Sequence, residues 1–316
     1  MVSVQETRLS PAAPENLPAR RRRRPVGRAA TYRDAALFLL PKALLFGVFI
    51  LVPFVYTFVL VFQDGSLLGD FRFVGLANFA TILSDSLFLS TLKNTLLFLV
   101  ILVPLTMTVP LAVGVLLSSK LAGLRFYRSL IYLPSLLSIV ATGLIWRVLV
   151  DPQSGPLNLF FQRVLDIEVP WLSNGTFAIF FIAVITMWSS LGFNSIIFMA
   201  GLNDIPDELV EAARIDGAGM WRTFWSIKLP LLRPVMQFVL ILTTIASVQV
   251  FDVIFVMTKG GPGTATYTAM WYIYQNVFNG GSVGYAATMS VILLLLTLVI
   301  SAFYLRATRS DGRGRG

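Results

Sequence analysis

The chain has 316 residues, of which 56% are hydrophobic and only 13% are charged, and its mean hydropathy is +0.77. This composition excludes a soluble domain and indicates a multi-pass membrane protein. The sequence contains no cysteine and no histidine, which excludes disulfides, cysteine metal sites and the commonest proton shuttle. We ascribe the net charge of +9 to membrane topology and anionic lipid, and we expect no nucleic-acid partner, because the sequence shows no basic folded domain.

Residues 1–34 are rich in Pro, Ala and Arg and lack an apolar run, so we expect a disordered, basic cytoplasmic tail. The arginine run at 20–24 precedes an apolar segment of span length that has no evident small-residue cleavage site. This segment is therefore expected to stay as a membrane anchor and not to be removed as a signal peptide. A nuclear-import or nucleic-acid role for the arginine run is the alternative.

The membrane domain is expected over residues 35–308, followed by a short cytoplasmic tail at 309–316. A spanning helix needs roughly 20 apolar residues. Six segments meet this requirement, at about 37–62, 95–117, 129–150, 177–199, 236–257 and 286–304. Prolines inside them, such as Pro104 and Pro134, are tolerated in membranes and predict kinked helices around a cavity. The predicted fold class is therefore all-α and polytopic, with six transmembrane helices.

The basic residues predict the orientation of these spans. Of the 25 Lys and Arg residues, most lie in the N-terminal tail, the second connection, the connection at about 201–234 and the C-terminus. The five exceptions are Arg72, Lys93, Arg147, Arg163 and Lys259. By the positive-inside rule, both termini and the connection at 201–234 are expected in the cytoplasm of a cell-membrane protein.

The connection at 201–234 has the pattern of a polar helical hairpin. Asn203 or Asp204 is expected to cap a helix that starts near residue 205, with acidic residues in its first turn. Gly217 and Gly219 allow left-handed backbone angles and are expected to end this helix. The second arm is expected to end at Leu229-Pro230, after an aromatic face made of Trp221, Phe224, Trp225 and Lys228. By pattern alone, the hairpin is either a docking element or a surface connection between two spans.

The hairpin resembles the cytoplasmic EAA loop of permease subunits from binding-protein-dependent ABC importers, in the sugar-uptake branch that contains maltose and glycerol-phosphate permeases. The matching positions are Glu211, Ala212, Ala213, Asp216, Gly217, Ala218, Phe224, Ile227, Leu229, Pro230 and Pro234. The resemblance implies that this helix inserts into a groove on the ATP-hydrolysing subunit. It assigns ATPase coupling to Glu211, Ala212, Ala213, Asp216, Gly217 and Ala218.

A second motif, at 258–266, follows the fifth span and is expected outside the cell. Its glycines and proline predict a rigid turn. The next helix carries an aromatic stripe, suited to the membrane interface, at Tyr267, Trp271, Tyr274 and Phe278. The sequence Thr-x-Gly-Gly-Pro in this motif also resembles the sugar-permease family. Three shorter matches, at 75–79, 94–95 and 284–287, extend the resemblance over nearly the whole chain from the first span onward.

Polar residues inside the fourth and fifth spans are candidates for a substrate pathway. A charged side chain within a span costs roughly 2.5–3.5 kcal/mol on insertion scales and normally faces a cavity or a partner. Asp252 is the clearest candidate, and Gln249 is expected one turn before it on nearly the same helix face. Asn194 and Trp188 form a second group in the fourth span. Hydrogen bonding between helices is the alternative role for these polar side chains.

The sequence lacks a Gly-x-x-x-x-Gly-Lys-Ser/Thr phosphate loop, so the chain is not expected to hydrolyse ATP or to bind a cofactor. The resemblance implies a non-catalytic importer permease with three kinds of protein partner. These are a second permease subunit, two ATP-binding subunits that use ATP and Mg²⁺, and an extracytoplasmic solute-binding protein. An ion-coupled secondary transporter is the main alternative, and a membrane-bound transferase is a third class.

Overall fold

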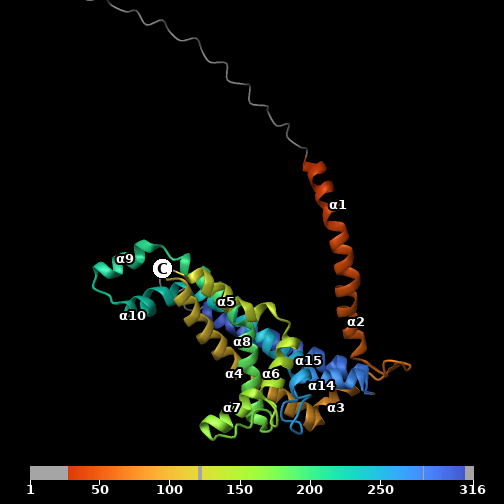
Figure 1. Cartoon of the computed structure of the whole chain (residues 1–316). Coiled ribbons are helices and arrows are strands. Elements are labelled where there is room, and N and C mark those ends of the chain that lie inside the picture. Colours follow the sequence, from red (N-terminus) through yellow and green to blue (C-terminus); the bar gives the residue numbers. More distant parts are fainter. Residues whose placement is uncertain (1–27, 120–122, 280, 310–316) are drawn as a thin grey trace, which may run out of the picture. The chain divides into compact units, whose positions relative to one another are not determined.

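The computed structural model describes residues 28–119, 123–279 and 281–309 (Figure 1). The chain divides into two compact units, Met1–Phe54 and Val55–Gly316, and the domain bounds expected at 35 and 308 stay predictions. Most residues of the two predicted tails, at 1–34 and 309–316, lie outside the described residues. The first helix begins at Arg28, so it includes the last residues of the predicted N-terminal tail.

The first apolar segment forms α1 (Arg28–Phe46), a π-helical turn η1 (Gly47–Leu51) and α2 (Val52–Leu60). The π turn comes directly before Pro53, which has no N–H to donate to a helical carbonyl. In this turn the amide of Val52 donates to the carbonyl of Gly47, a wider spacing than in an α-helix. The span window Leu37–Leu60 contains no buried residues.

The second unit is helical apart from one short antiparallel ladder, in which Gln63 pairs with Phe73 and Asp64 with Arg72. Its elements are β1 (Gln63–Asp64), β2 (Arg72–Phe73), α3 (Ala77–Ser84), α4 (Ser86–Leu117), α5 (Leu124–Leu136), α6 (Ile139–Leu149), α7 (Pro156–Leu165), α8 (Gly175–Asn203), α9 (Asp207–Ile215), α10 (Met220–Thr223), η2 (Phe224–Lys228), α11 (Leu229–Leu231), α12 (Arg233–Val248), α13 (Asp252–Met257), α14 (Ala269–Phe278) and α15 (Val283–Arg309).

Among the described residues, four helices are long and apolar enough to cross a membrane, and the number rises to six if each of two bent helix pairs is one span. The four are Leu37–Leu60, Ser86–Leu117, Gly175–Asn203 and Val283–Arg306. The predicted second span began at residue 95, but α4 starts at Ser86. Asp85 accounts for this early start, since its carboxylate accepts hydrogen bonds from the amides of Leu87 and Phe88 at 2.9 and 3.0 Å.

The third and fifth spans are interrupted, and the kink that Pro134 predicted in the third span lies close to one of the interruptions. Helices α5 and α6 meet at a bend of 93°, because Leu137 and Ser138 between them adopt extended backbone angles. A second bend of 67° separates the segment Met220–Leu231 from α12. The fifth span breaks again between α12 and α13, over residues 249–251. The break at 249–251 was not predicted, although it includes the polar residue Gln249 and comes directly before Asp252.

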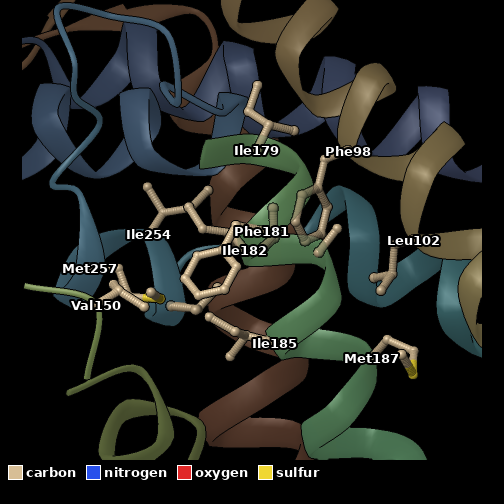
Figure 2. Packing of buried hydrophobic residues seen from close by; sticks show 13 residues of the cluster. Phe98, Leu102, Val150, Ile179, Phe181, Ile182, Ile185, Met187, Ile254 and Met257 are labelled. Atoms are coloured by element: carbon tan, nitrogen blue, oxygen red, sulfur yellow. The ribbon is translucent and has the colours of Figure 1, made fainter. Parts of the chain in front are cut away.

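The core of the second unit is built around α4 and α8, which approach each other closely at small residues. A Cβ atom on Gly114 of α4 would lie 2.9 Å from the Cβ atom of Phe198 and 3.0 Å from the carbonyl oxygen of Ser195, both on α8. The largest apolar cluster combines side chains of these two helices with the end of α6 and with α13 (Figure 2). Its labelled members are Phe98, Leu102, Val150, Ile179, Phe181, Ile182, Ile185, Met187, Ile254 and Met257.

The close contact between α5 and α8 predicts the effect of a small substitution. A Cβ atom on Gly192 would lie 2.5 Å from the Cα atom of Tyr132 and 2.6 Å from the carbonyl oxygen of Ile131, so Gly192→Ala must separate two backbones. We expect it to lower the free energy of unfolding by about 1–3 kcal/mol. Thermal unfolding in detergent measures this effect, with Gly47→Ala as control, since no atom lies within 4 Å of a Cβ there. Equal melting temperatures for the two variants would contradict the packing described.

Candidate coupling and translocation sites

The hairpin predicted at 201–234 is present, but its first helix begins later than expected. Helix α8 continues through Asn203, and α9 starts at Asp207 with Pro206 as its N-cap residue. The predicted capping by Asn203 or Asp204 is therefore wrong. Asp207 and Glu208 do lie in the first turn of α9, near the positive end of the helix dipole. The hairpin follows the C-terminal end of α8, and α7 comes before its N-terminal end, so the two lie at opposite ends of this helix (Figure 1).

Gly217 ends α9 in a Schellman motif and has the left-handed backbone conformation that the sequence predicted. Its φ angle is 77°. The amide of Ala218 donates to the carbonyl of Ala213 at 2.8 Å, and the amide of Gly217 donates to the carbonyl of Arg214 at 3.0 Å. Apart from its chain neighbours, no atom of the described residues lies within 4 Å of a Cβ placed on Gly217, so backbone strain, and not lack of space, disfavours other residues there.

The tip of the hairpin exposes large apolar side chains. Ile215 is 87% exposed, Met220 is 91% exposed and Trp221 is 74% exposed. Of the predicted coupling residues, Glu211, Ala212, Asp216 and Gly217 are exposed, Ala218 is half-buried and Ala213 is buried. Large apolar side chains gathered on a protruding element indicate a protein-binding surface.

The second arm of the hairpin is packed onto the membrane helices. It runs as one helical segment through Pro230 to Leu231 and bends at Leu232, so the predicted end at Leu229-Pro230 is wrong. The arm contains the π-helical turn η2, in which the amide of Leu229 donates to the carbonyl of Phe224. Phe224 and Leu229 pack against an apolar cluster that includes Phe198 and Leu202 of α8 and Leu111 of α4. The arm therefore connects the exposed tip to the core of the second unit.

The break in the fifth span contains two of the four predicted pathway residues. Helix α12 ends at Val248 and α13 begins at Asp252, so Gln249 and Asp252 do not share a helix face as predicted. Both side chains are nevertheless exposed at the break. The hydroxyl of Thr268, which is 2% exposed, donates to the carbonyl of Val250 at 3.1 Å. This bond satisfies a backbone carbonyl in the break.

The other two predicted pathway residues lie in α8 with different surroundings. Asn194 is buried. Trp188 is half-buried and makes an edge contact with Trp146 of α6, with the ring centroids 5.6 Å apart. The structure therefore does not place Trp188 and Asn194 on the exposed surface that carries Gln249 and Asp252. The pathway role of Trp188 and Asn194 and the alternative of hydrogen bonding between helices both stay predictions.

The aromatic stripe after the fifth span is mostly part of a ring cluster. Trp271 is only 3% exposed, so its prediction as an interfacial anchor is wrong. Its ring stacks near Phe251 and Tyr274, with centroid distances of 5.8 and 5.7 Å, and Phe255 lies 5.7 Å away. The cluster lies directly beside the break in the fifth span, since Phe251 is part of it. Tyr274 also contacts Phe278, which is exposed.

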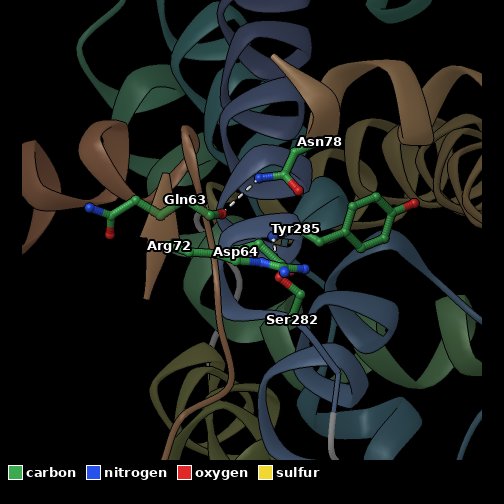
Figure 3. A network of polar contacts seen from close by, with 6 residues as sticks. All are labelled: Gln63, Asp64, Arg72, Asn78, Ser282 and Tyr285. Atoms are coloured by element: carbon green, nitrogen blue, oxygen red, sulfur yellow. Dashed lines mark hydrogen bonds and ion pairs between the residues drawn. The ribbon is translucent and has the colours of Figure 1, made fainter. Parts of the chain in front are cut away.

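Three polar side chains outside the predicted pathway groups hold connections between the helices together. Asn78 donates to the carbonyls of Val61 and Gln63 at 2.8 and 2.9 Å, next to the contacts that link Asp64 with Arg72 and Ser282 (Figure 3). Asn94 donates in the same way to the carbonyls of Thr264 and Tyr267. These are the asparagines of the short matches at 75–79 and 94–95, so the resemblance marked them without explaining them.

The third residue is Asp85, which joins α4, α14 and α15. Besides capping α4, its carboxylate accepts hydrogen bonds from the hydroxyls of Tyr272 and Tyr285, at 2.9 and 2.5 Å. Burial opposes ionisation of Asp85, but the hydrogen bonds from Tyr285, Phe88, Tyr272 and Leu87 outweigh it and lower its pKa. An acidic residue just before an apolar run signals a helix cap, so the sequence could have indicated the capping role of Asp85. It could not indicate the two tyrosine partners of Asp85, because they are distant in the chain.

Comparisons with known proteins agree with this architecture. Residues 111–309 match the family described as "Binding-protein-dependent transport system inner membrane component". The trehalose/maltose transport system permease protein MalF of Thermococcus litoralis is 33% identical over 282 residues, which cover 88% of this chain and 95% of that protein. The sn-glycerol-3-phosphate transport system permease protein UgpA of Agrobacterium fabrum is 34% identical over 236 residues, which cover 74% of this chain and 80% of that protein.

A solved structure supports the fold. The crystal structure of a bacterial alginate ABC transporter, in complex with an alginate pentasaccharide-bound periplasmic protein, contains a chain that matches with a TM-score of 0.78. The match covers 90% of this chain and 98% of that chain at 22% sequence identity.

The helices and the exposed hairpin define a multi-pass membrane subunit of a transport system. The chain belongs to the family of binding-protein-dependent transport system inner membrane components. It is a permease component of an ABC importer in the cell membrane, a non-catalytic subunit that binds no cofactor itself. The predicted family and the all-α membrane fold are confirmed, whereas the orientation of the termini stays a prediction.

Asp85 is expected to make stability depend on pH in the acid range. Its folded pKa lies below the ordinary value of 3.8, so its stabilising effect is complete above that value and is lost as the pH falls through the folded pKa. The melting temperature should therefore change little between about pH 7 and 5 and fall below about pH 4. Asp85→Asn should lower it at neutral pH and remove this part of the acid dependence. Identical pH profiles for wild type and Asp85→Asn would contradict the assignment.

Proposed function

We propose that this chain is one of two permease subunits of an ATP-driven importer that carries a sugar or sugar derivative across the cell membrane, with both termini in the cytoplasm. The relatives reported above are named for trehalose and maltose and for sn-glycerol-3-phosphate, and the solved transporter is named for alginate. The compounds in these names are all polyhydroxylated, which supports this substrate class. The single observation that carries the coupling role is the exposed apolar tip of a hairpin whose second arm packs into the membrane core.

The energy comes from two partner ATPase subunits that bind ATP and Mg²⁺. The tip around Ile215 and Met220, together with the EAA-loop positions 211–218, occupies a groove on one of these subunits. A displacement of the tip reaches the core of the second unit through Phe224 and Leu229, because these side chains pack against the cluster that contains Leu111 of α4 and Phe198 of α8. Such coupling requires the affinity of the hairpin for the ATPase subunit to differ between the two conformational states of the transporter. A solute-binding protein delivers the substrate from outside.

Gln249 and Asp252 form the substrate pathway in this proposal. Their amide and carboxylate groups provide hydrogen-bond partners for sugar hydroxyls, and the ring cluster beside them offers apolar faces. Asn194 and Trp188 have a smaller part in it, because Asn194 is buried and Trp188 packs on Trp146. An ion-coupled secondary transporter, the alternative from the sequence, conflicts with the family to which the chain belongs.

Docking of the hairpin on the ATPase predicts the effect of a charge at its tip. Ile215→Asp places a carboxylate on a side chain that is 87% exposed, so folding is expected to tolerate it while the apolar contact is lost. We expect at least about a tenfold loss of ATPase subunit retained on the purified permease, which corresponds to about 1.4 kcal/mol. Leu68→Asp is the control, since Leu68 is 99% exposed and lies outside the hairpin. Full retention by Ile215→Asp would exclude docking through this tip.

The pathway role of Asp252 predicts a graded loss of transport. Asp252→Asn keeps the shape and part of the hydrogen bonding, whereas Asp252→Leu removes both the charge and the polar atoms. Hydrogen bonds to charged groups contribute about 1.5–3 kcal/mol, so Asp252→Leu is expected to lower the uptake rate by about tenfold or more, and Asp252→Asn by less. Complex yield should stay normal in both variants, with Asp70→Leu in a connecting loop as control. Normal uptake by Asp252→Leu excludes the role, and loss of assembly supports a structural one.

A further inference from the structure

A cavity lined by both polar and apolar side chains lies at the C-terminal end of α6, apart from the hairpin and from the break in the fifth span. Its volume is about 270 Å³. It is lined by Leu144, Arg147, Val148, Asp151 and Ser154. The cavity therefore combines a cation, an anion, a hydroxyl group and two apolar side chains.

The two opposite charges in this cavity do not pair with each other. The guanidinium of Arg147 donates through Nη1 to the carbonyl of Val256 on α13, at 3.1 Å. Asp151 accepts three hydrogen bonds on Oδ1, from the amides of Gln153 and Ser154 and from the hydroxyl of Ser154, at 2.9–3.1 Å. The Ser154 amide and hydroxyl are the largest influences that lower the pKa of Asp151, which keeps it ionised. Each charge is thus held by its own neighbours, and both side chains line the cavity.

The cavity lies where an apolar helix surface meets polar sequence. Helices α5 and α6 together are long and apolar enough to form one membrane span with a bend between them. On α6, Leu144 and Val148 are one turn apart and are 47% and 66% exposed. After Val150 the sequence continues with Asp-Pro-Gln-Ser at 151–154. Such a change from apolar to polar residues is expected at a membrane surface, where lipid headgroups meet acyl chains.

We propose that this cavity binds the headgroup of phosphatidylethanolamine. The planar guanidinium of Arg147 suits a phosphate, and a carboxylate suits a protonated amine with three N–H donors. This headgroup carries both groups a few bonds apart, so one molecule bridges Arg147 and Asp151. The acyl chains lie along Leu144 and Val148. Asp151 disfavours a simple anion or an anionic lipid that has no amine, since neither supplies a positive charge.

The test compares two lipids that differ only in the amine. Native mass spectrometry is applied to the full-length chain in the complex in which it purifies, after delipidation and titration with phosphatidylethanolamine or phosphatidylcholine of identical acyl chains. The trimethylated amine of phosphatidylcholine has no N–H to donate to Asp151. Wild type is expected to retain phosphatidylethanolamine about tenfold better, a difference of about 1.4 kcal/mol.

Variants separate the two halves of the site. Asp151→Asn is expected to remove the preference for phosphatidylethanolamine, and Arg147→Gln to weaken retention of both lipids. Arg163→Gln, on an exposed residue of α7, is the matched control and should behave as wild type. Asp151→Asn gives a decisive result even if Arg147→Gln does not fold.

Three results would overturn the proposal. Equal retention of the two lipids by wild type shows that the amine is not recognised. An unchanged preference in Asp151→Asn shows that another group recognises it. Displacement of the lipid by soluble phosphoethanolamine or inorganic phosphate at matching concentrations shows a site for a free solute. Retention of phosphatidylethanolamine against both competitors supports the lipid site.

Discussion

Backbone groups in a membrane protein must find hydrogen-bond partners inside the protein, and the broken helices of this chain depend on side chains for them. In the break at 249–251, the carbonyl of Val250 accepts a hydrogen bond from the hydroxyl of Thr268. The first amide of α14, at Ala269, donates to the hydroxyl of Thr95 on α4 at 2.9 Å. Asn94, on the same helix, binds two carbonyls of the connecting loop. The connection after the fifth span is thus bonded to α4 and to the break itself.

This constraint links the fold to transport. A continuous fifth span would hide its backbone groups and place Gln249 and Asp252 on one helix face. The break instead exposes both side chains beside a cluster of aromatic rings. At the other end of α12, the bend at Leu232 leads into the arm that carries the hairpin tip. The same discontinuous span therefore connects the proposed substrate surface with the proposed ATPase contact.

The sequence predicted the features that depend on local chemistry. The hairpin, its end at Gly217 and the four long apolar helices follow from residue pattern, because capping and hydrophobicity act over a few residues. Pro134 predicted a kink close to the break at 137–138, but the break at 249–251 did not follow, since the carbonyl of Val250 is satisfied by Thr268, which is distant in the chain. Asp85 was missed for the same reason, because its two tyrosine partners come from α14 and α15. The family resemblance pointed to Asn78 and Asn94, and the structure supplied their physical role.

The most direct test of this account is the hydrogen exchange of backbone amides around the fifth-span break. Thr268→Val keeps the shape of the side chain but removes the hydroxyl that donates to Val250 and accepts from the amide of Trp271. An unsatisfied buried carbonyl costs about 1–3 kcal/mol, so protection of the amides at the start of α14 is predicted to fall by about tenfold or more. Protection within α8 should not change. Unaltered protection at the start of α14 in Thr268→Val would contradict the account.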